Sequence, residues 1–187
     1  MHRRTFLGLG AGGLALLAGC ETAETADTPE ALAAARQRTD RATVFGRLRW
    51  IENGEERRIE QSMFGWSVTP RLRRLGDGAV MNTEIDPGGH FVWSLPAGAY
   101  RIDRINYRDP WSGNYFVSPG VTFRAPENGR TYYVGTLRVE ARTERGFLGT
   151  MGGAARFTVE NRLAEEQAYL RGKLGTDIAS VETALMG

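Results

Sequence analysis

The stretch from residue 89 to residue 102 constrains the fold more than any other part of this 187-residue chain. Large apolar side chains recur there at every second position, namely Phe91, Trp93 and Leu95. This spacing puts them on one face of a β-strand and leaves His90 on the other, more polar face. Residues 95–98 (Leu-Pro-Ala-Gly) fit a type I turn, and alternation resumes at Tyr100. The sequence therefore predicts a half-buried β-hairpin.

Short apolar runs separated by turn residues fill the rest of residues 42–160. Asn53-Gly54 is a strong hairpin signal, and a turn at 126–129 precedes a long β-branched and aromatic run. We count seven or eight short strands at spacings typical of an antiparallel β-sandwich. A chain of this length buries enough surface to fold without a disulfide, and Cys20 is the only cysteine. The predicted fold class is mainly β, with residues 42–160 as the sandwich domain.

The pattern changes after residue 160. Asn161 can cap a helix whose apolar positions continue to Gly175, and residues 176–185 suit a second short helix. We therefore expect a C-terminal helical tail over residues 161–187, lying against the sandwich.

The first nineteen residues have the composition of an export signal. Arg3 and Arg4 precede an apolar run at 6–18 that is too short to span a membrane. The run ends in Leu-Ala-Gly-Cys at Cys20, which resembles the lipobox of bacterial lipoproteins. The resemblance implies a signal peptide over residues 1–19 and a diacylglycerol on the Cys20 sulfur, so that acyl chains anchor the protein to membrane lipid.

Two further resemblances concern the destination. Residues 3–7 (Arg-Arg-Thr-Phe-Leu) resemble a twin-arginine export signal, but His2 stands where Ser or Thr is usual, so general secretory export stays open. Glu21 is not the Asp that, in enteric bacteria, retains lipoproteins at the inner membrane. The resemblances imply a cell-envelope protein anchored on the periplasmic side, with the outer membrane favoured over the inner.

The segment 20–41 has Leu32 as its only large apolar residue. Such a segment cannot bury a core, so we expect a flexible tether between the lipidated cysteine and the sandwich. Thr28, Pro29 and Glu30 stand in the order of an N-cap, a first-turn proline and an early acid, which favours a short helix over residues 30–38 within it.

The charge balance excludes one class of partner. The 24 Lys and Arg residues include Arg3 and Arg4, so without residues 1–19 the basic residues equal the 22 acidic ones. Nucleic-acid binding needs a net basic stripe, and we therefore expect no nucleic-acid partner.

Residues 89–102 also carry a family resemblance. Gly-His-Phe-Val-Trp-Ser-Leu-Pro-Ala-Gly-Ala-Tyr-Arg-Ile resembles the pattern G-x-F-x-[aromatic]-x-L-P-x-G-x-Y of transthyretin-like and carboxypeptidase regulatory-like domains. Residues 44–48 resemble the first strand of that family, and residues 131–137 look like the penultimate strand of its bacterial lipoproteins. The resemblance implies an immunoglobulin-like or transthyretin-like sandwich over roughly residues 42–160 and says little about function, because one fold hosts many roles.

Catalytic and metal-binding groups are scarce. His90 is the one histidine beyond the leader, and its place on the polar face of a strand predicts a solvated side chain, so we expect no enzyme activity. Zinc needs about three or four nitrogen or sulfur ligands, which the composition lacks. Asp77, Glu84 and Asp86 could hold calcium, but ordinary turn acids explain their spacing better. We expect neither a metal nor a cofactor.

An aromatic loop is one candidate for binding. Residues 108–120 are polar and turn-rich, and they carry Trp111, Tyr115 and Phe116. Aromatic rings on a loop can stack on a glycan or a peptide. This predicts a glycan- or peptide-binding module that uses Trp111 and Tyr115.

A run of arginines is the other candidate. Arg71, Arg73 and Arg74 on a tethered domain could contact anionic headgroups, each contributing about 1 kcal/mol. Such a domain would be a non-catalytic structural or accessory envelope lipoprotein, with other envelope proteins or the membrane surface as partners. We favour this interpretation and keep the glycan- or peptide-binding module as the alternative.

Overall fold

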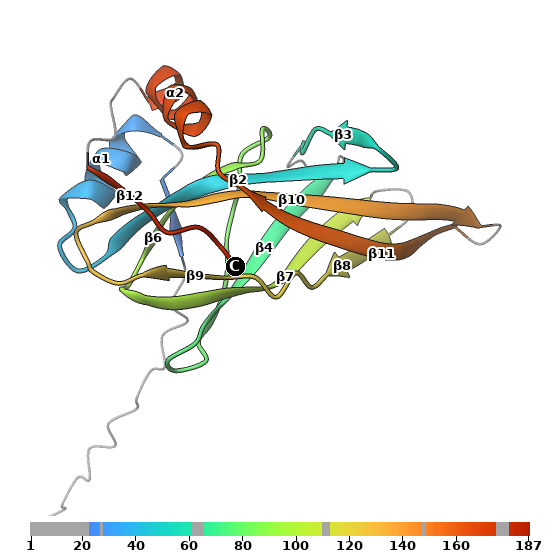
Figure 1. Cartoon of the computed structure of the whole chain (residues 1–187), viewed down its shortest axis with the longest axis horizontal. Helices are drawn as coiled ribbons and strands as arrows, with labels where there is room; N and C mark the ends of the chain where they lie inside the picture. Colours follow the sequence, from blue (N-terminus) through green and yellow to red (C-terminus); the bar gives the residue numbers. More distant parts are fainter. Residues whose placement is uncertain (1–22, 27, 61–65, 110–112, 147–148, 175–179) are drawn as a thin grey trace, which may run out of the picture.

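A computed structural model describes residues 23–26, 28–60, 66–109, 113–146, 149–174 and 180–187. Within these residues the protein is mainly β, with two packed β-sheets and two helices (Figure 1). The predicted mainly-β class is confirmed. In the part of the chain that the structure describes, the helices are too short or too polar to cross a membrane.

The larger layer is a seven-stranded sheet with the central order β1-β6-β2-β10-β11, in which β3 also pairs with β2 and β12 with β10. Its strands are β1 (Glu24–Thr25), β2 (Ala42–Glu52), β3 (Glu55–Arg57), β6 (His90–Leu95), β10 (Thr131–Gly146), β11 (Gly149–Glu160) and β12 (Val181–Thr183). The smaller layer is a five-stranded sheet with the order β5-β4-β7-β8 and β9 beside β7. Its strands are β4 (Ser67–Arg74), β5 (Val80–Asn82), β7 (Gly98–Asp109), β8 (Gly113–Val117) and β9 (Thr122–Ala125).

The strand count and direction differ from the prediction. The described residues form twelve strands where seven or eight were predicted, and four of the twelve are only two or three residues long. The seven-stranded sheet is mixed, because β10 runs parallel to both β2 and β12. Turn spacing predicts antiparallel neighbours, but β2 and β10 are distant in the sequence, so no local turn fixes their relative direction.

The stretch 89–102 joins the two layers. β6 pairs with β1 and β2, whereas β7 pairs with β4, β8 and β9, so the predicted hairpin pairing is wrong. The predicted inner face is confirmed, because Phe91, Trp93 and Leu95 are buried between the sheets. Tyr100 is buried there too, and its hydroxyl donates a hydrogen bond to the carbonyl of Pro96 across the bend. The proline turn thus carries the chain from one sheet to the other.

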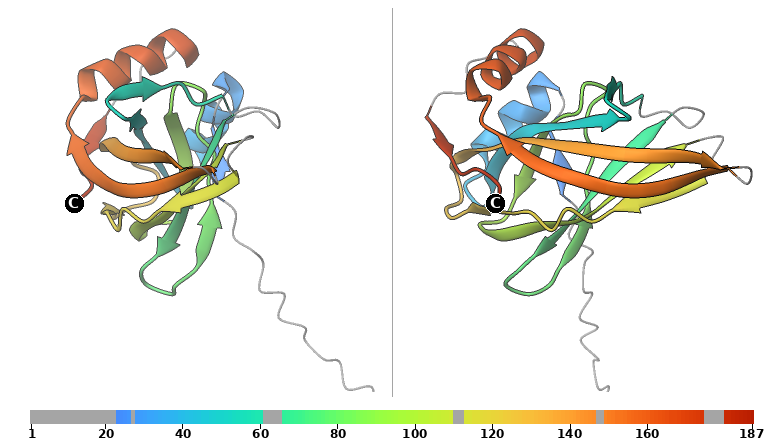
Figure 2. Two further views of the ribbon diagram at one scale, coloured as in Figure 1. Left: turned by 90° about the vertical axis from the view of Figure 1, so that its right-hand side faces the viewer. Right: turned by 45° about the vertical axis from the view of Figure 1, so that its right-hand side comes forward.

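The second face of the seven-stranded sheet is covered by α1 (Pro29–Gln37) and α2 (Leu163–Leu174), as the two views in Figure 2 show. A second apolar cluster lies beneath the helices, and it contains Leu32, Phe45, Val92, Tyr133 and Leu170. Strand β6 is therefore buried on both faces, where half-burial was predicted. Local alternation did not reveal this because the covering helices come from distant parts of the chain.

The segment expected to be a flexible tether belongs to the fold wherever the structure describes it. Glu24 and Thr25 extend the sheet as β1 beside β6, and Ala26 donates a backbone hydrogen bond to Val92 (2.8 Å). The predicted short helix is α1, which Thr28 caps by accepting from the amide of Ala31. One leucine suffices to attach α1 to the sheet, because Leu32 is fully buried in the apolar cluster under the helices.

The C-terminal region is helical only in part. The predicted first helix is α2, but residues 180–187 contain β12 instead of the predicted second helix. Met186 fills space between the sheets, and Gly187 exchanges backbone hydrogen bonds with Thr122 of β9 (2.8 and 2.9 Å). This segment is extended because Val181, beside β10, has a strand partner that the local sequence does not show.

Candidate functional site

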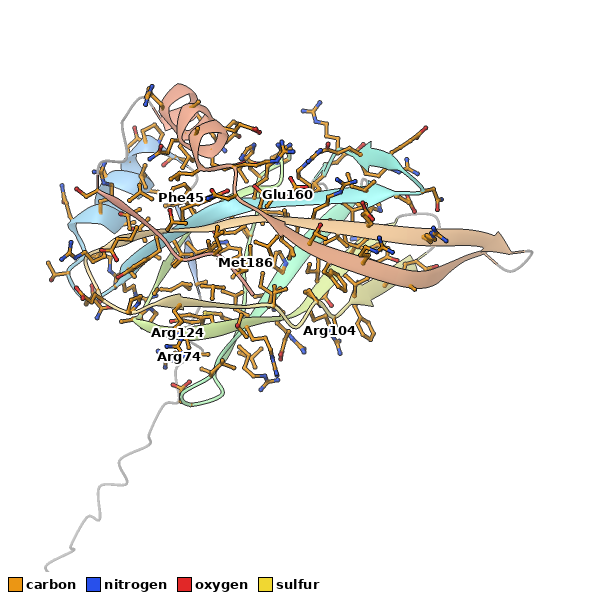
Figure 3. The ribbon with its side chains drawn as sticks, in the orientation of Figure 1. Phe45, Arg74, Arg104, Arg124, Glu160 and Met186 are labelled. Atoms are coloured by element: carbon orange, nitrogen blue, oxygen red, sulfur yellow. The ribbon has the colours of Figure 1, made fainter. Side chains whose placement is uncertain are left out.

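The outer face of the five-stranded sheet is rich in arginine. Alternation along β4, β7 and β9 turns apolar side chains such as Leu72, Ile102 and Phe123 into the core and their neighbours outward. We call the outward arginines the arginine face, and they are Arg71, Arg73, Arg101, Arg104, Arg108 and Arg124. In Figure 3, Arg104 and Arg124 lie on the side of this sheet opposite Glu160 and the helices.

Arginines on this face stand directly opposite one another. Arg71 is paired in register with Arg104, and Arg73 with Arg101. Like charges directly opposite on neighbouring strands destabilise a sheet. The Nε atoms of Arg71 and Arg104 are buried and have no hydrogen-bond partner among the described residues. The face therefore holds like charges close together, with hydrogen-bonding capacity that the described residues do not use.

Asp103 is the acidic side chain within this group. Its carboxylate lies 2.6 Å from Nε of Arg73, 2.7 Å from Nε of Arg101 and 3.9 Å from an Nη of Arg71. Burial raises the pKa of Asp103, but the hydrogen bonds from Arg73 and Arg101 outweigh it and hold the pKa below its ordinary value. Among the described residues, the remaining arginines of the face have no ion-pair partner, so one carboxylate serves a cluster of guanidinium groups.

An exposed aromatic side chain borders the arginines. Phe116 on β8 is 57% exposed, and the Arg104 guanidinium lies 4.0 Å from its ring centre. A shallow depression of about 350 Å³ opens beside it, and Arg108, Asn106 and Asn114 contribute to its lining. The depression offers cationic and amide donors next to an apolar ring.

The predicted arginine run divides between two sides of the sheet. Arg71 and Arg73 are on the arginine face, but Arg74 is one position out of phase and pairs with Asp77 in the adjoining turn. The hydrogen bond from Arg74 lowers the pKa of Asp77 to about 2. Arg101, Arg104, Arg108 and Arg124 were not predicted as site residues. Each lies next to a buried apolar residue of β7 or β9, which was a usable signal, but only the register shift between β4 and β7 puts Arg101 and Arg104 on one face.

The structure describes only part of the predicted aromatic loop. Trp111 lies outside the described residues. Residues 113–117 form strand β8, so Tyr115 and Phe116 point to opposite faces. Tyr115 is half-buried and stacks on Tyr107 (5.3 Å between ring centres), whereas Phe116 is exposed. Tyr115 therefore supports the core, and Phe116 is the aromatic ring that a ligand could reach.

The anchor residues themselves lie outside the described residues, namely Arg3, Arg4 and Cys20. The first described residues indicate where on the domain such an anchor would be attached. Ala23 packs on the core, and Glu24 pairs with Ser94 close to the bend at 96–97. In Figures 1 and 2, β1 begins on the side of the five-stranded sheet and leads toward α1 on the other side.

Two further predictions concern His90 and the turn acids. His90 was predicted to be solvated, which is wrong, because its side chain is 10% exposed and bonded to Glu166 of α2. Among the turn acids, Asp86 accepts hydrogen bonds from Tyr169 and Lys173. In the described ranges no group of three or more His, Cys, Asp or Glu side chains is placed to hold a metal ion.

Comparisons with known proteins give no information on function. Comparison of the chain with protein-family models, with curated proteins and with solved structures found no match.

Proposed function

We propose that this protein is a lipid-anchored accessory module of the bacterial cell envelope whose arginine face rests on an anionic membrane surface. In this proposal Cys20 carries the lipid, residues 1–19 are removed on export, and the sandwich is of the transthyretin-like type. The domain faces the periplasm, with the outer membrane favoured.

The observation that carries the proposal is the pairing of Arg71 with Arg104 and of Arg73 with Arg101 across β4 and β7. A sheet face that places like charges opposite each other is stabilised by an external anion. Phosphate groups suit this face because arginine donates two parallel hydrogen bonds to them. An array of such arginines on one sheet face can contact several headgroups of a membrane at once.

The position of β1 supports the same orientation. Only Glu21 and Thr22 separate Cys20 from Ala23, which packs on the core. Three extended residues span at most about 11 Å, which is close to the distance over which physiological salt screens charge, about 8 Å. A lipid on Cys20 would therefore hold the domain against the membrane, on the side from which β1 starts.

Flotation with lipid vesicles tests the proposal. We expect the full-length protein with Cys20→Ser to bind vesicles containing phosphatidylglycerol and not vesicles of phosphatidylcholine alone. The triple substitution of Arg71, Arg73 and Arg104 to Gln should weaken binding about a hundredfold, at about 1 kcal/mol for each arginine. The matched control replaces exposed arginines elsewhere, namely Arg36, Arg130 and Arg156, with Gln. Equal binding by the two triple variants would refute the role of the arginine face.

The anchor has its own test. Intact-mass analysis of the membrane fraction should show a diacylglycerol-modified chain that begins at Cys20, and Cys20→Ala should abolish the modification. A wild-type chain that keeps residues 1–19 would refute the anchor while leaving the arginine face open to test.

Phe116 favours a second candidate, a module that binds an acidic glycan. Its exposed ring beside the arginine-lined depression could stack on a sugar while Arg104 and Arg108 bind carboxylates. Phe116→Ala should then abolish binding to an acidic polysaccharide and leave vesicle binding by the arginines nearly unchanged.

A further inference from the structure

A second polar cluster lies where α2 meets the loop before β6, on the layer opposite the arginine face. His90 Nδ1 is 2.6 Å from Glu166 Oε2, and the Glu166 side chain is 2% exposed. The Tyr169 ring is stacked on the imidazole, with 3.5 Å between ring centres and 8° between the planes. The imidazole is therefore fixed both in its plane and at one nitrogen.

These contacts determine which nitrogen carries the proton. A buried carboxylate accepts hydrogen bonds, so in the neutral form of His90 Nδ1 donates to Glu166 and Nε2 keeps its lone pair. Tyr169 is held in turn by donating its hydroxyl proton to Asp86. Burial raises the pKa of Tyr169, and the hydrogen bond to Asp86 raises it further, so the ring stays neutral and anchored.

The Nε2 edge of the imidazole is left open by a glycine. A Cβ atom at Gly88 would lie 2.9 Å from Cδ2 and 3.3 Å from Nε2 of His90. The backbone of Gly88 is not in the left-handed region, so another residue is disfavoured here because its side chain would crowd His90, and not because of backbone strain. No described group forms a hydrogen bond to Nε2.

A pocket of about 260 Å³ adjoins this cluster. Ile85, Pro87 and Leu170 contribute apolar surface, and Lys173 contributes an ammonium group that is 2.9 Å from Asp86 Oδ2. Lys173 is the only lysine in the chain. The volume is below the range of about 300–1,000 Å³ that is usual for drug-sized ligands, so the pocket suits a small molecule.

We propose that His90 is the nucleophile of a small esterolytic site that takes short-chain carboxylic esters. This inference goes beyond the proposed function and is independent of it. A nucleophilic imidazole needs a free nitrogen, a partner that orients the other nitrogen and a pocket for the acyl group, and His90 has all three. Glu166 is the positioning residue, and its carboxylate also neutralises the positive charge that develops on the acylated ring.

The reaction has two steps. The Nε2 lone pair forms a bond to the ester carbonyl carbon, and the bond from that carbon to the leaving oxygen breaks, releasing the alkoxide or phenolate. Water then adds to the acyl carbon, and the carbon–nitrogen bond breaks with its electron pair returning to Nε2. The products are the carboxylate and the alcohol or phenolate, and the protons released pass to the buffer. No metal or redox partner takes part.

The test uses full-length protein in detergent with p-nitrophenyl acetate as the probe. We expect release of p-nitrophenolate at least tenfold faster than with an equal concentration of N-acetylhistidine amide. Acid quenching should trap one acetyl group on His90, located by peptide mass spectrometry. His90→Gln, which can still donate to Glu166, should lower the rate at least tenfold.

One further variant and one further measurement test the assignment. Gly88→Ala retains His90 but crowds its Nε2 edge, so it should lower the rate severalfold while thermal unfolding stays close to that of the wild type. The peptide mass spectra should show the trapped acetyl group on His90 and not on Lys173, the only lysine of the chain. Equal rates in wild type and His90→Gln, or an acetyl group on Lys173 in place of His90, would overturn the assignment. A wild-type rate no faster than that of the free imidazole would also overturn it and leave His90 as a structural clamp for α2.

Discussion

The outer surfaces of the two sheets both carry arginines, but the charge on them is balanced very differently. On the seven-stranded sheet, Arg49 and Arg138 lie next to carboxylates, with Glu56 2.5 Å from Arg49 and Glu140 2.6 Å from Arg138. Glu160 contacts three guanidinium groups, at 2.6 Å to Arg162 and 3.6 Å to each of the other two. On the five-stranded sheet, Asp103 is the one carboxylate that contacts the arginine face among the described side chains. The first surface neutralises its charge internally, whereas the arginine face has an excess of positive charge.

The largest effect should come from making the arginine face resemble its counterpart. Arg104→Glu puts a carboxylate opposite Arg71 and changes the charge by two units. At about 1 kcal/mol for each unit, binding to anionic vesicles should fall about thirtyfold, as measured by flotation. Thermal unfolding should stay the same or rise slightly. A large loss of stability would mean that Arg104 is needed for packing, and the comparison between the two faces would fail.

Asp103→Asn should separate stability from binding. The substitution removes the negative charge that is 2.6 Å from Arg73 and 2.7 Å from Arg101, so the free energy of unfolding in urea should fall by about 1–2 kcal/mol. Vesicle binding should become stronger, because the face gains net positive charge. Weaker binding in this variant would contradict the role of the arginine face.

Glu160→Gln tests the ion pairs on the outer surface of the seven-stranded sheet, through the pH dependence of stability. Burial raises the pKa of Glu160, but its contacts with Arg162, Arg49 and Arg138 outweigh burial and lower the pKa from its ordinary value of 4.5. A carboxylate with a lowered pKa stabilises the fold above its ordinary pKa, and this stabilisation is lost as the pH falls through the lowered value. The variant should therefore be less stable than the wild type by about 1 kcal/mol at neutral pH. This difference should shrink on acidification below about 4.5, and a constant difference would contradict the ion-pair account.

The smallest effect is expected for Arg71→Gln. Arg71 faces Arg104, and its nearest carboxylate, Asp103, is 3.9 Å away, so stability should change by less than about 0.5 kcal/mol. Arg138→Gln on the outer surface of the seven-stranded sheet is the control, and it should be the more destabilising of the two substitutions. The reverse order in urea unfolding would show that the two surfaces do not differ as described.

Local patterns in the sequence predicted the burial of side chains well. They predicted poorly which segments lie next to one another. Alternation identified Phe91 and Trp93 as core residues, because strand periodicity depends only on the residues themselves. It failed for His90, since the partner that removes it from solvent, Glu166, is 76 residues away. The register shift between β4 and β7 that brings Arg71 opposite Arg104 likewise depends on a distant strand.

The short strand β12 has a consequence for how the protein matures. It adds to the seven-stranded sheet, Met186 enters the gap between the layers, and Gly187 bonds to β9 of the other layer. In the sequence β12 follows every other strand that the structure describes, so the ribosome delivers it after those strands. Until residues 180–187 join the sheets, the apolar surface that Met186 covers would be exposed, and such exposed surface promotes aggregation during folding.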